Sequence, residues 1–356
     1  MPAVSAMRRK NAITKSQEMA ECRRGAARGA VCGLRRTDPG MSDSLPRIAV
    51  LGSFMQACCW RVDRLPRPGE TLRAGDFSAE PAGKGLSVAV GCHRLGAAVD
   101  LVMAIGNDAP AGTLLEWLRR EGLHARHIHR CAMPSGHGAG FIDAAGENQI
   151  VVHGGANAAL SPREVARAAP DIAAAALLYA QLEIPLAAVQ AGLALARSRG
   201  VPTVLNPSPW QTLPEEMLDC ADVLVVNESE AQALLEDALS GEKEARPRRI
   251  VSALPALWRR WRGNWLVATL GAQGSMACHR DGTIHVAPAF PADPLKTLGA
   301  GDAFSAGLCW GLARGEDMAA ALRAGNACGA LSISRPGILA ALPGRQELEA
   351  LLRPAA

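Results

Sequence analysis

The sequence of 356 residues is long enough for one large domain or two modest ones, and its 49% hydrophobic and 20% charged residues are typical of a soluble globular protein. No run of about 18 apolar residues predicts a membrane-spanning helix. The first 40 residues carry nine Lys or Arg and three Asp or Glu, whereas the remainder has 29 basic and 31 acidic residues, which argues against a nucleic-acid-binding surface on the main body.

Residues 1–45 are expected to form a disordered, basic N-terminal extension. They lack the long apolar run of a secretory signal, and an Arg-rich targeting segment is the alternative. Periodic sequence begins only at Pro46, which makes Met41 a natural first residue. The ten cysteines form no Cys-x-x-Cys pair and no Cys/His metal spacing, which favours reduced thiols in a cytoplasmic protein.

Short apolar runs alternate with helical patterns along the rest of the chain. Residues 47–53 are expected to form a buried strand, 84–97 a helix of small residues, and 99–106 the next strand. The alternation continues in further segments, at 109–123, 171–183, 186–209, 221–235 and 264–275. It predicts a three-layer α/β/α domain with a mainly parallel central sheet, whose ligands would bind beyond the carboxyl ends of the strands.

A second pattern interrupts the first. Four short strands are expected at 54–62, 72–80, 138–144 and 148–154, with a hairpin turn at 144–148. Strands inserted near the beginning of an α/β domain predict a small β-sheet lid over its ligand edge, here within about 54–80 and 138–154.

The stretch KTLGAGDAF (296–304) carries the clearest chemical pattern. Gly299, Ala300 and Gly301 at the start of a helix can point backbone N–H groups at an anionic oxygen, assisted by the helix dipole. A carboxylate inside such a site suits the removal of a proton from a hydroxyl that attacks phosphorus, and Asp302 is the candidate. The alternative is an ordinary helix start with Asp302 as a first-turn acid.

This stretch resembles the Asp-Thr-x-Gly-Ala-Gly-Asp signature of the ribokinase/PfkB carbohydrate kinases. The resemblance runs from Pro46 to about Pro343 and is closest to the ribokinase branch. It implies a Rossmann-like, ribokinase-type domain over 46–345, followed by a C-terminal tail at 346–356. Further matching motifs occur in the order of the family: RPGET (67–71), AGKG (82–85), GENQIVVHGGANAALSP (146–162), QLEIP (181–185), LNPSP (205–209), NESEA (227–231), TLGAQG (269–274) and NACGALSISRPG (326–337).

The resemblance implies roles for matching residues. Asp302 would be the general base, and Gly299, Ala300 and Gly301 would form the anion hole for the transferring phosphate. Asn227 and Glu230 match a motif that positions Mg²⁺ and its water, although a simple strand-end cap is the alternative.

The remaining implied roles divide between the two substrates. ATP would lie beside Asn227, Thr269, Gly271, Gly274 and Gly301, with Asn326 near the adenine. The acceptor sugar would be bordered by Gly83, Lys84, Gly85, Ser87 and Glu183 together with Met55, Ala57 and Asp302. Two alternatives without a role in ligand binding stay open. Lys84 would then be a turn residue with its amine in water, and Asn326 a polar residue on a small-residue helix.

Three of these positions depart from the family. Met55 and Ala57 stand where ribokinases have a sugar-binding Asn and Asp, and Ser87 stands where they have an Asn. Because a site built to bind hydroxyl groups discriminates strongly, these changes favour a different acceptor from ribose. A nucleoside would suit the apolar residues, and Gln56 could turn inward to recover one contact.

A fourth departure is Lys296, which replaces the first Asp of the signature, while Ala341 replaces a serine that assists it in binding a monovalent cation. We hypothesise that the Lys296 ammonium supplies the charge of that cation, so that K⁺ is not required. A solvent-facing lysine beside a lost cation site is the alternative.

The sequence therefore predicts an ATP- and Mg²⁺-dependent carbohydrate kinase that acts on a sugar or sugar-containing small molecule. A nucleoside kinase of the same family and a non-catalytic sugar or nucleotide sensor are the alternatives. The expected partners are small molecules, without nucleic acid or membrane. A homodimer through the lid is also expected, because the lid in this family often pairs with a second copy.

Overall fold

The computed structural model describes residues 45–144, 148–235, 246–295 and 297–353, all within one unit of the chain, 35–356. The predicted N-terminal extension, except Leu45, therefore lies outside the described residues, as do Lys296 and most of the predicted hairpin turn at 144–148. Within the described part, no helix combines the length and apolar character needed to cross a membrane.

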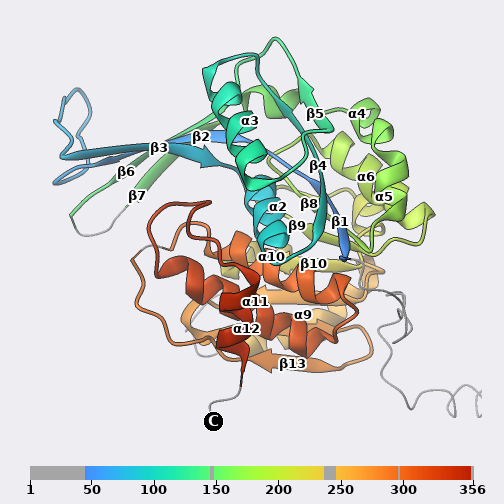
Figure 1. The fold of residues 1–356 in the computed structure, drawn as a ribbon. Coiled ribbons are helices and arrows are strands. Elements are labelled where there is room, and N and C mark those ends of the chain that lie inside the picture. The colour runs from blue at the N-terminus through green and yellow to red at the C-terminus, as the bar shows by residue number, and fades with distance from the viewer. Residues whose placement is uncertain (1–44, 145–147, 236–245, 296, 354–356) are drawn as a thin grey trace, which may run out of the picture. The chain divides into compact units, whose positions relative to one another are not determined.

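A nine-stranded sheet forms the centre of the fold, in the order β13-β12-β11-β10-β9-β8-β1-β4-β5 (Figure 1). Seven of its strands pair in parallel and two continue the sheet in antiparallel fashion, which confirms the predicted mainly parallel sheet. The parallel strands are β1 (Arg47–Leu51), β4 (Ala98–Ile105), β5 (His127–Arg130), β8 (Leu177–Gln181), β9 (Thr203–Asn206), β10 (Val223–Val226) and β11 (Trp265–Thr269). The antiparallel ones are β12 (Ser275–His279) and β13 (Ile284–Ala287).

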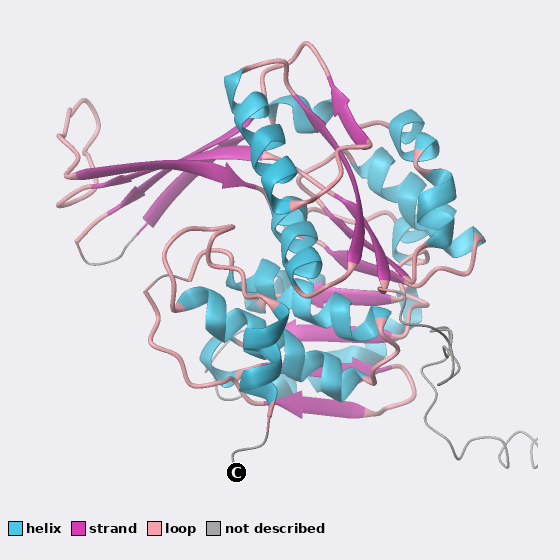
Figure 2. Ribbon diagram, in the orientation of Figure 1, coloured by secondary structure: helices cyan, strands magenta, loops and turns pink. Residues whose placement is uncertain are grey.

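Helices cover both faces of this sheet, as buried Val-, Leu- and Ile-rich strands require (Figure 2). On one face lie α2 (Lys84–Arg94), α10 (Ala300–Ala313) and α11 (Met318–Ile333). A large core on the other face is formed with α4 (Pro162–Arg167), α5 (Ala169–Ala174), α6 (Leu186–Ser198), α7 (Glu215–Leu218), α8 (Glu228–Leu234) and α9 (Arg246–Arg260). The described part of the chain also contains the helices α3 (Ala109–Glu121) and α12 (Arg345–Leu352).

A second, four-stranded sheet stands out from these layers and forms the predicted lid (Figure 1). Its order is β3 (Asp76–Ala82), β2 (Met55–Arg61), β6 (Gly136–Ile142) and β7 (Asn148–His153). The outer pairs are antiparallel, but β2 and β6 run in parallel. Strand β3 begins four residues later than expected because the preceding segment is irregular, and β6 begins two residues earlier.

The lid is fastened to the central domain at its base. The side chain of Asn157 in η1 (Gly155–Ala159) accepts a hydrogen bond from the Phe54 N–H (2.9 Å) and donates one to the Phe54 carbonyl (2.7 Å). Phe54 directly precedes β2. This buried clasp fixes the point at which the chain leaves β1 and enters the lid.

Candidate active site

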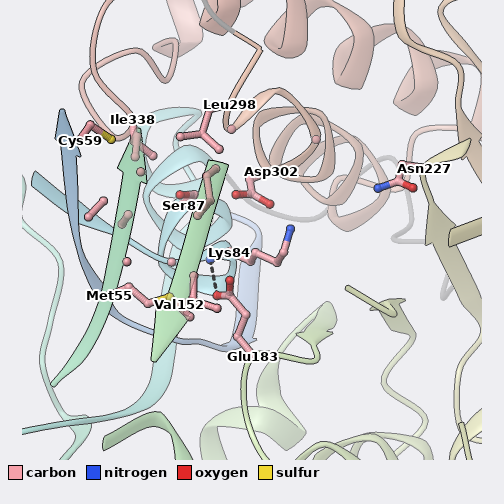
Figure 3. Close-up of a pocket in the computed structure, with 18 of the residues that line it drawn as sticks. Met55, Cys59, Lys84, Ser87, Val152, Glu183, Asn227, Leu298, Asp302 and Ile338 are labelled. Carbon is pink, nitrogen blue, oxygen red and sulfur yellow. Dashed lines mark hydrogen bonds between the residues drawn. The ribbon is translucent and has the colours of Figure 1, made fainter. Parts of the chain in front are cut away.

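A cavity of about 560 Å³ lies between the lid and the carboxyl ends of the central strands (Figure 3). Its lining combines lid residues and the starts of α2 and α10 with residues at or just beyond the ends of β8, β10 and β11. Among the predicted site residues it contains Met55, Ala57, Gly83, Lys84, Ser87, Glu183, Asn227, Thr269, Gly271, Gly299, Gly301 and Asp302. The position agrees with the rule that parallel sheets bind ligands at this edge.

The start of α10 exposes backbone to the cavity. Gly299 is its N-cap, with a left-handed φ of 86°, which glycine adopts without strain. A Cβ added to Gly301 would meet no atom within 4 Å, so a ligand can approach this backbone closely. The N–H groups of a first helical turn have no intrahelical acceptor, but that of Ala300 donates to the Thr297 carbonyl at 3.3 Å. Ala300 is therefore less available to a phosphate than Gly301.

Asp302 lies in the first turn of α10 and faces Lys84 across the cavity (Figure 3). Burial raises its pKa to about 7, against the Lys84 ammonium, which lowers it, while the carboxylates of Glu183 and Glu230 raise it further. Burial lowers the pKa of Lys84, but the carboxylates of Asp302, Glu183 and Glu230 outweigh this effect. The pKa of the Lys84 ammonium is therefore raised. A carboxyl with a pKa near neutrality is suited to general-base chemistry.

Glu183 organises the end of the cavity near the start of α2. Its Oε2 accepts hydrogen bonds from the Ser53 hydroxyl (2.6 Å) and from the Lys84 backbone N–H (2.9 Å). Gly83, just before α2, has a φ of 132°, and a Cβ there would lie 2.3 Å from the Ser53 carbonyl oxygen. A Cβ on Gly85 would lie 2.4 Å from the Gly52 Cα. The two glycines thus allow α2 to begin directly against the end of β1.

Asn227 and Glu230 form a capping box at the start of α8. The Asn227 Oδ1 accepts from the Glu230 N–H, and the Glu230 Oε2 accepts from the Asn227 N–H, both at 2.9 Å. Asn227 lines the cavity, whereas the buried Glu230 lies behind it and contacts Asn206. The cap foreseen as an alternative is therefore present, and it also holds the Asn227 side chain at the cavity wall.

The predicted nucleotide residues occupy two different places. Thr269 and Gly271 line the cavity at the end of β11. Gly274 packs against the Ala287 carbonyl, and Asn326 donates from Nδ2 to the Ala287 and Pro288 carbonyls at 2.9 and 3.0 Å. Neither of these two residues is part of the cavity lining, so here they brace the segment after β13.

The sequence profile of the pfkB family carbohydrate kinases matches residues 45–345. The chain belongs to this family. It is 33% identical to the ribokinase of Haemophilus influenzae over 84% of this chain and 96% of that protein, and 32% identical to the ribokinase of Bacillus subtilis over 86% and 99%. The structure of Arabidopsis thaliana ribokinase complexed with ribose and ATP has a TM-score of 0.79 and 25% identity, over 88% of this chain and 100% of that one. The protein is thus an ATP-dependent carbohydrate kinase of ribokinase fold.

In this carbohydrate kinase, the lid supplies most of the lining that the sequence did not predict. These residues are Cys58, Cys59, Ala82, Gly138, Gly140, Ile150 and Val152, joined by Glu228, Ser229, Leu298 and Ile338 from the central domain. The period-two alternation of strands places every second lid residue on one face, which was the available signal. The face that meets the cavity depends on the register between β2 and β6. These two strands are distant in sequence, so the local pattern does not predict that face.

Lys296, proposed as a built-in cation of the kinase, lies outside the described residues. Its neighbours Leu298 and Gly299 line the cavity, and Ala341, which replaces the expected serine, is buried. The cation hypothesis therefore stays a prediction from the sequence.

Proposed function

We propose that this kinase transfers the terminal phosphoryl group of ATP to a hydroxyl of a sugar or of a small sugar-containing molecule, with Asp302 as general base. The observation that carries the proposal is the position of Asp302: it lies in the first turn of α10, beside the open backbone of Gly301, and its pKa is raised to about 7. The same cavity offers room for an acceptor and for the end of a nucleotide.

In the proposed reaction the Asp302 carboxylate accepts the proton of the acceptor hydroxyl. The oxygen forms a new bond to the terminal phosphorus of ATP as the bond to the bridging oxygen breaks, and ADP leaves. Negative charge on the transferring group would be met by the N–H groups at the start of α10 and by the Lys84 ammonium. Glu183, fixed by Ser53, would accept hydrogen bonds from acceptor hydroxyls.

A magnesium ion fits the donor set on the nucleotide side. Asn227 and Glu228 line the cavity and Glu230 lies just behind them, which gives the amide and carboxylate oxygens that Mg²⁺ prefers. One oxygen each of Asn227 and Glu230 is engaged in the capping box, so we propose that these two residues hold the ion through water. When bound, Mg²⁺ would neutralise phosphate charge.

We further propose that K⁺ is not required, because a lysine stands at position 296 where the family signature has an acid. Turnover in K⁺, Na⁺ and Tris buffers of equal ionic strength should then be equal. Strong activation by K⁺ would contradict this.

A non-catalytic sensor is the alternative function, and Asp302→Asn separates the two. The amide keeps the shape but cannot act as the base, so we expect product formation to fall by about 10²–10⁴-fold while calorimetric binding of nucleotide and acceptor persists. The wild-type acceptor screen would contain ribose, 2-deoxyribose, fructose and several nucleosides with Mg²⁺. Equal, weak turnover by both proteins would favour the sensor.

We also propose a homodimer through the outer face of the lid. Trp60 lies between Phe77 and Phe141 on the face opposite to Ala57. Its ring centroid is 5.1 Å from that of Phe77 and 5.5 Å from that of Phe141. Phe77 and Val151 on this face are 54% and 71% exposed. Such an apolar surface on a thin sheet is typical of an interface.

A further inference from the structure

We infer that the acceptor carries a planar, apolar substituent in addition to its sugar, and that this substituent lies against the inner face of the lid; the inference rests on the proposed function. One cavity is divided into two chemically different halves (Figure 3). Lys84, Glu183 and Asp302 gather at the end near α2 and α10.

The opposite wall is built by three lid strands and has a different character. Neighbouring residues across the strands form two rows, Ala57–Gly138–Val152 and Cys59–Gly140–Ile150. Both rows line the cavity, as does Met55 at the base of β2. Among the lining residues of these two rows, only Cys59 has a hydrogen-bonding side chain, a weakly polar thiol.

An unsubstituted sugar fits this wall poorly. It carries hydroxyl groups around its ring, and those that turned toward the lid would exchange water for apolar side chains without a new hydrogen bond. Ile150 and Val152 remain 50% and 57% exposed, so an apolar group placed against them would remove further apolar surface from water. Both effects favour a substituted acceptor over a free one.

The two glycines of β6 make the wall flat. Neither has a left-handed φ, and a Cβ on Gly138 would lie 3.7 Å from Val152 Cγ1, while one on Gly140 would lie 3.5 Å from Cys59 Sγ. These are ordinary contact distances, so the backbone would tolerate a side chain at either position. Steric crowding therefore does not require glycine at position 138 or 140. The resulting flat strip between the side chains of β2 and β7 suits a planar ring.

Ser87 supplies an independent indication that a polar ligand group reaches the boundary of the two halves. Its side chain is 1% exposed and lines the cavity, and its Oγ has no hydrogen-bond partner among the described residues. Buried hydroxyls are normally satisfied, so this one is a candidate partner for a hydroxyl or ring oxygen of the bound acceptor.

The experiment compares ribose, methyl β-ribofuranoside, phenyl β-ribofuranoside and inosine as acceptors with ATP and Mg²⁺, and measures their binding by calorimetry. We expect kcat/KM and affinity to be about tenfold higher for the phenyl riboside and inosine than for ribose and the methyl riboside. Gly138→Val should reduce that preference several-fold by filling the strip. Ala139→Val, on the opposite face of the same strand, is the matched control and should leave the preference intact.

The outcomes separate the two proposals. The inference is overturned, while the kinase function stands, if ribose matches the phenyl riboside in both affinity and kcat/KM. The same conclusion follows if Gly138→Val lowers kcat/KM equally for every acceptor. If the aryl riboside binds more tightly than ribose but yields no phosphorylated product, the inference stands and the proposed function fails. If neither the phenyl riboside nor inosine binds, the inference is also overturned.

Discussion

At the scale of single residues, the site depends on the balance between one ammonium and three carboxylates. Lys84 lowers the pKa of Asp302, while burial, Glu183 and Glu230 raise it, and the result is a pKa of about 7. The proposed base is therefore half deprotonated near neutral pH. Activity should rise as the pH increases through 7, because only the carboxylate can accept a proton.

Lys84→Met tests this balance. Loss of the ammonium removes the influence that lowers the pKa of Asp302, so the acidic limb of the kcat/KM profile should move to higher pH. The kcat at the optimum should fall about 10²–10³-fold, because the proposed donor to the transferring phosphate is lost. Arg119→Met on the exposed face of α3 is the control and should change neither. An unshifted limb would separate Lys84 from the titration of Asp302.

At the scale of elements, the lid touches the catalytic region through strand β3 as well as through its base. The Glu80 Oε2 accepts a hydrogen bond of 2.7 Å from the Ile338 N–H. Ile338 lines the cavity, and its Cγ2 lies 3.9 Å from the position of a Cβ on Gly299. Glu80 thus connects the lid to the loop beside Gly299, in the proposed anion hole.

Glu80→Ala should loosen this connection. Charge-assisted hydrogen bonds contribute about 1–3 kcal/mol, so we expect faster hydrogen exchange at the Ile338 amide and a several-fold higher KM for the acceptor, with a smaller change in kcat. Glu80→Gln retains an acceptor oxygen and should restore most of both. Glu70→Ala, which removes a partner of Arg64 elsewhere in the lid, is the control. Unchanged exchange at Ile338 would refute the role.

The elements also show what local sequence can predict. Apolar runs gave β1, β4 and β8, and small residues gave α2 and α10, because these patterns are set by neighbours in the chain. The motif residues Asp302, Lys84 and Glu183 were placed in one cavity by the resemblance. The parallel pairing of β2 with β6, the Asn157 clasp and the role of Asn326 as a brace could not be predicted, since each depends on contacts between segments far apart in sequence.

At the scale of the whole molecule, the lid has two apolar faces with different proposed partners. The inner face, with Val152, would meet the acceptor, and the outer face, with Val151, would meet a second copy. Adjacent residues of one short strand therefore separate substrate choice from assembly.

Val151→Glu tests the assembly. A carboxylate at the centre of an apolar interface should dissociate a dimer, and light scattering should then report the monomer mass. Val286→Glu on the edge strand β13 is a matched control, because Val286 is 68% exposed compared with 71% for Val151. Dissociation by the control variant alone would place the interface on β13, and a monomeric wild-type protein would rule out the dimer.

The raised pKa of Asp302 also has a consequence for folding. Between about pH 3.8 and 7 the folded chain holds a proton that the unfolded chain has released, so this residue lowers the free energy of unfolding as the pH rises through that window. At pH 8 the free energy of unfolding of Asp302→Asn should therefore exceed that of the wild type by about 1–2 kcal/mol, after allowance for solvent screening. The variant should accordingly unfold at a higher temperature. The difference should shrink toward pH 4 in calorimetry, and its absence at pH 8 would argue against the raised pKa. The proposed catalytic base would then be a residue that makes the fold less stable.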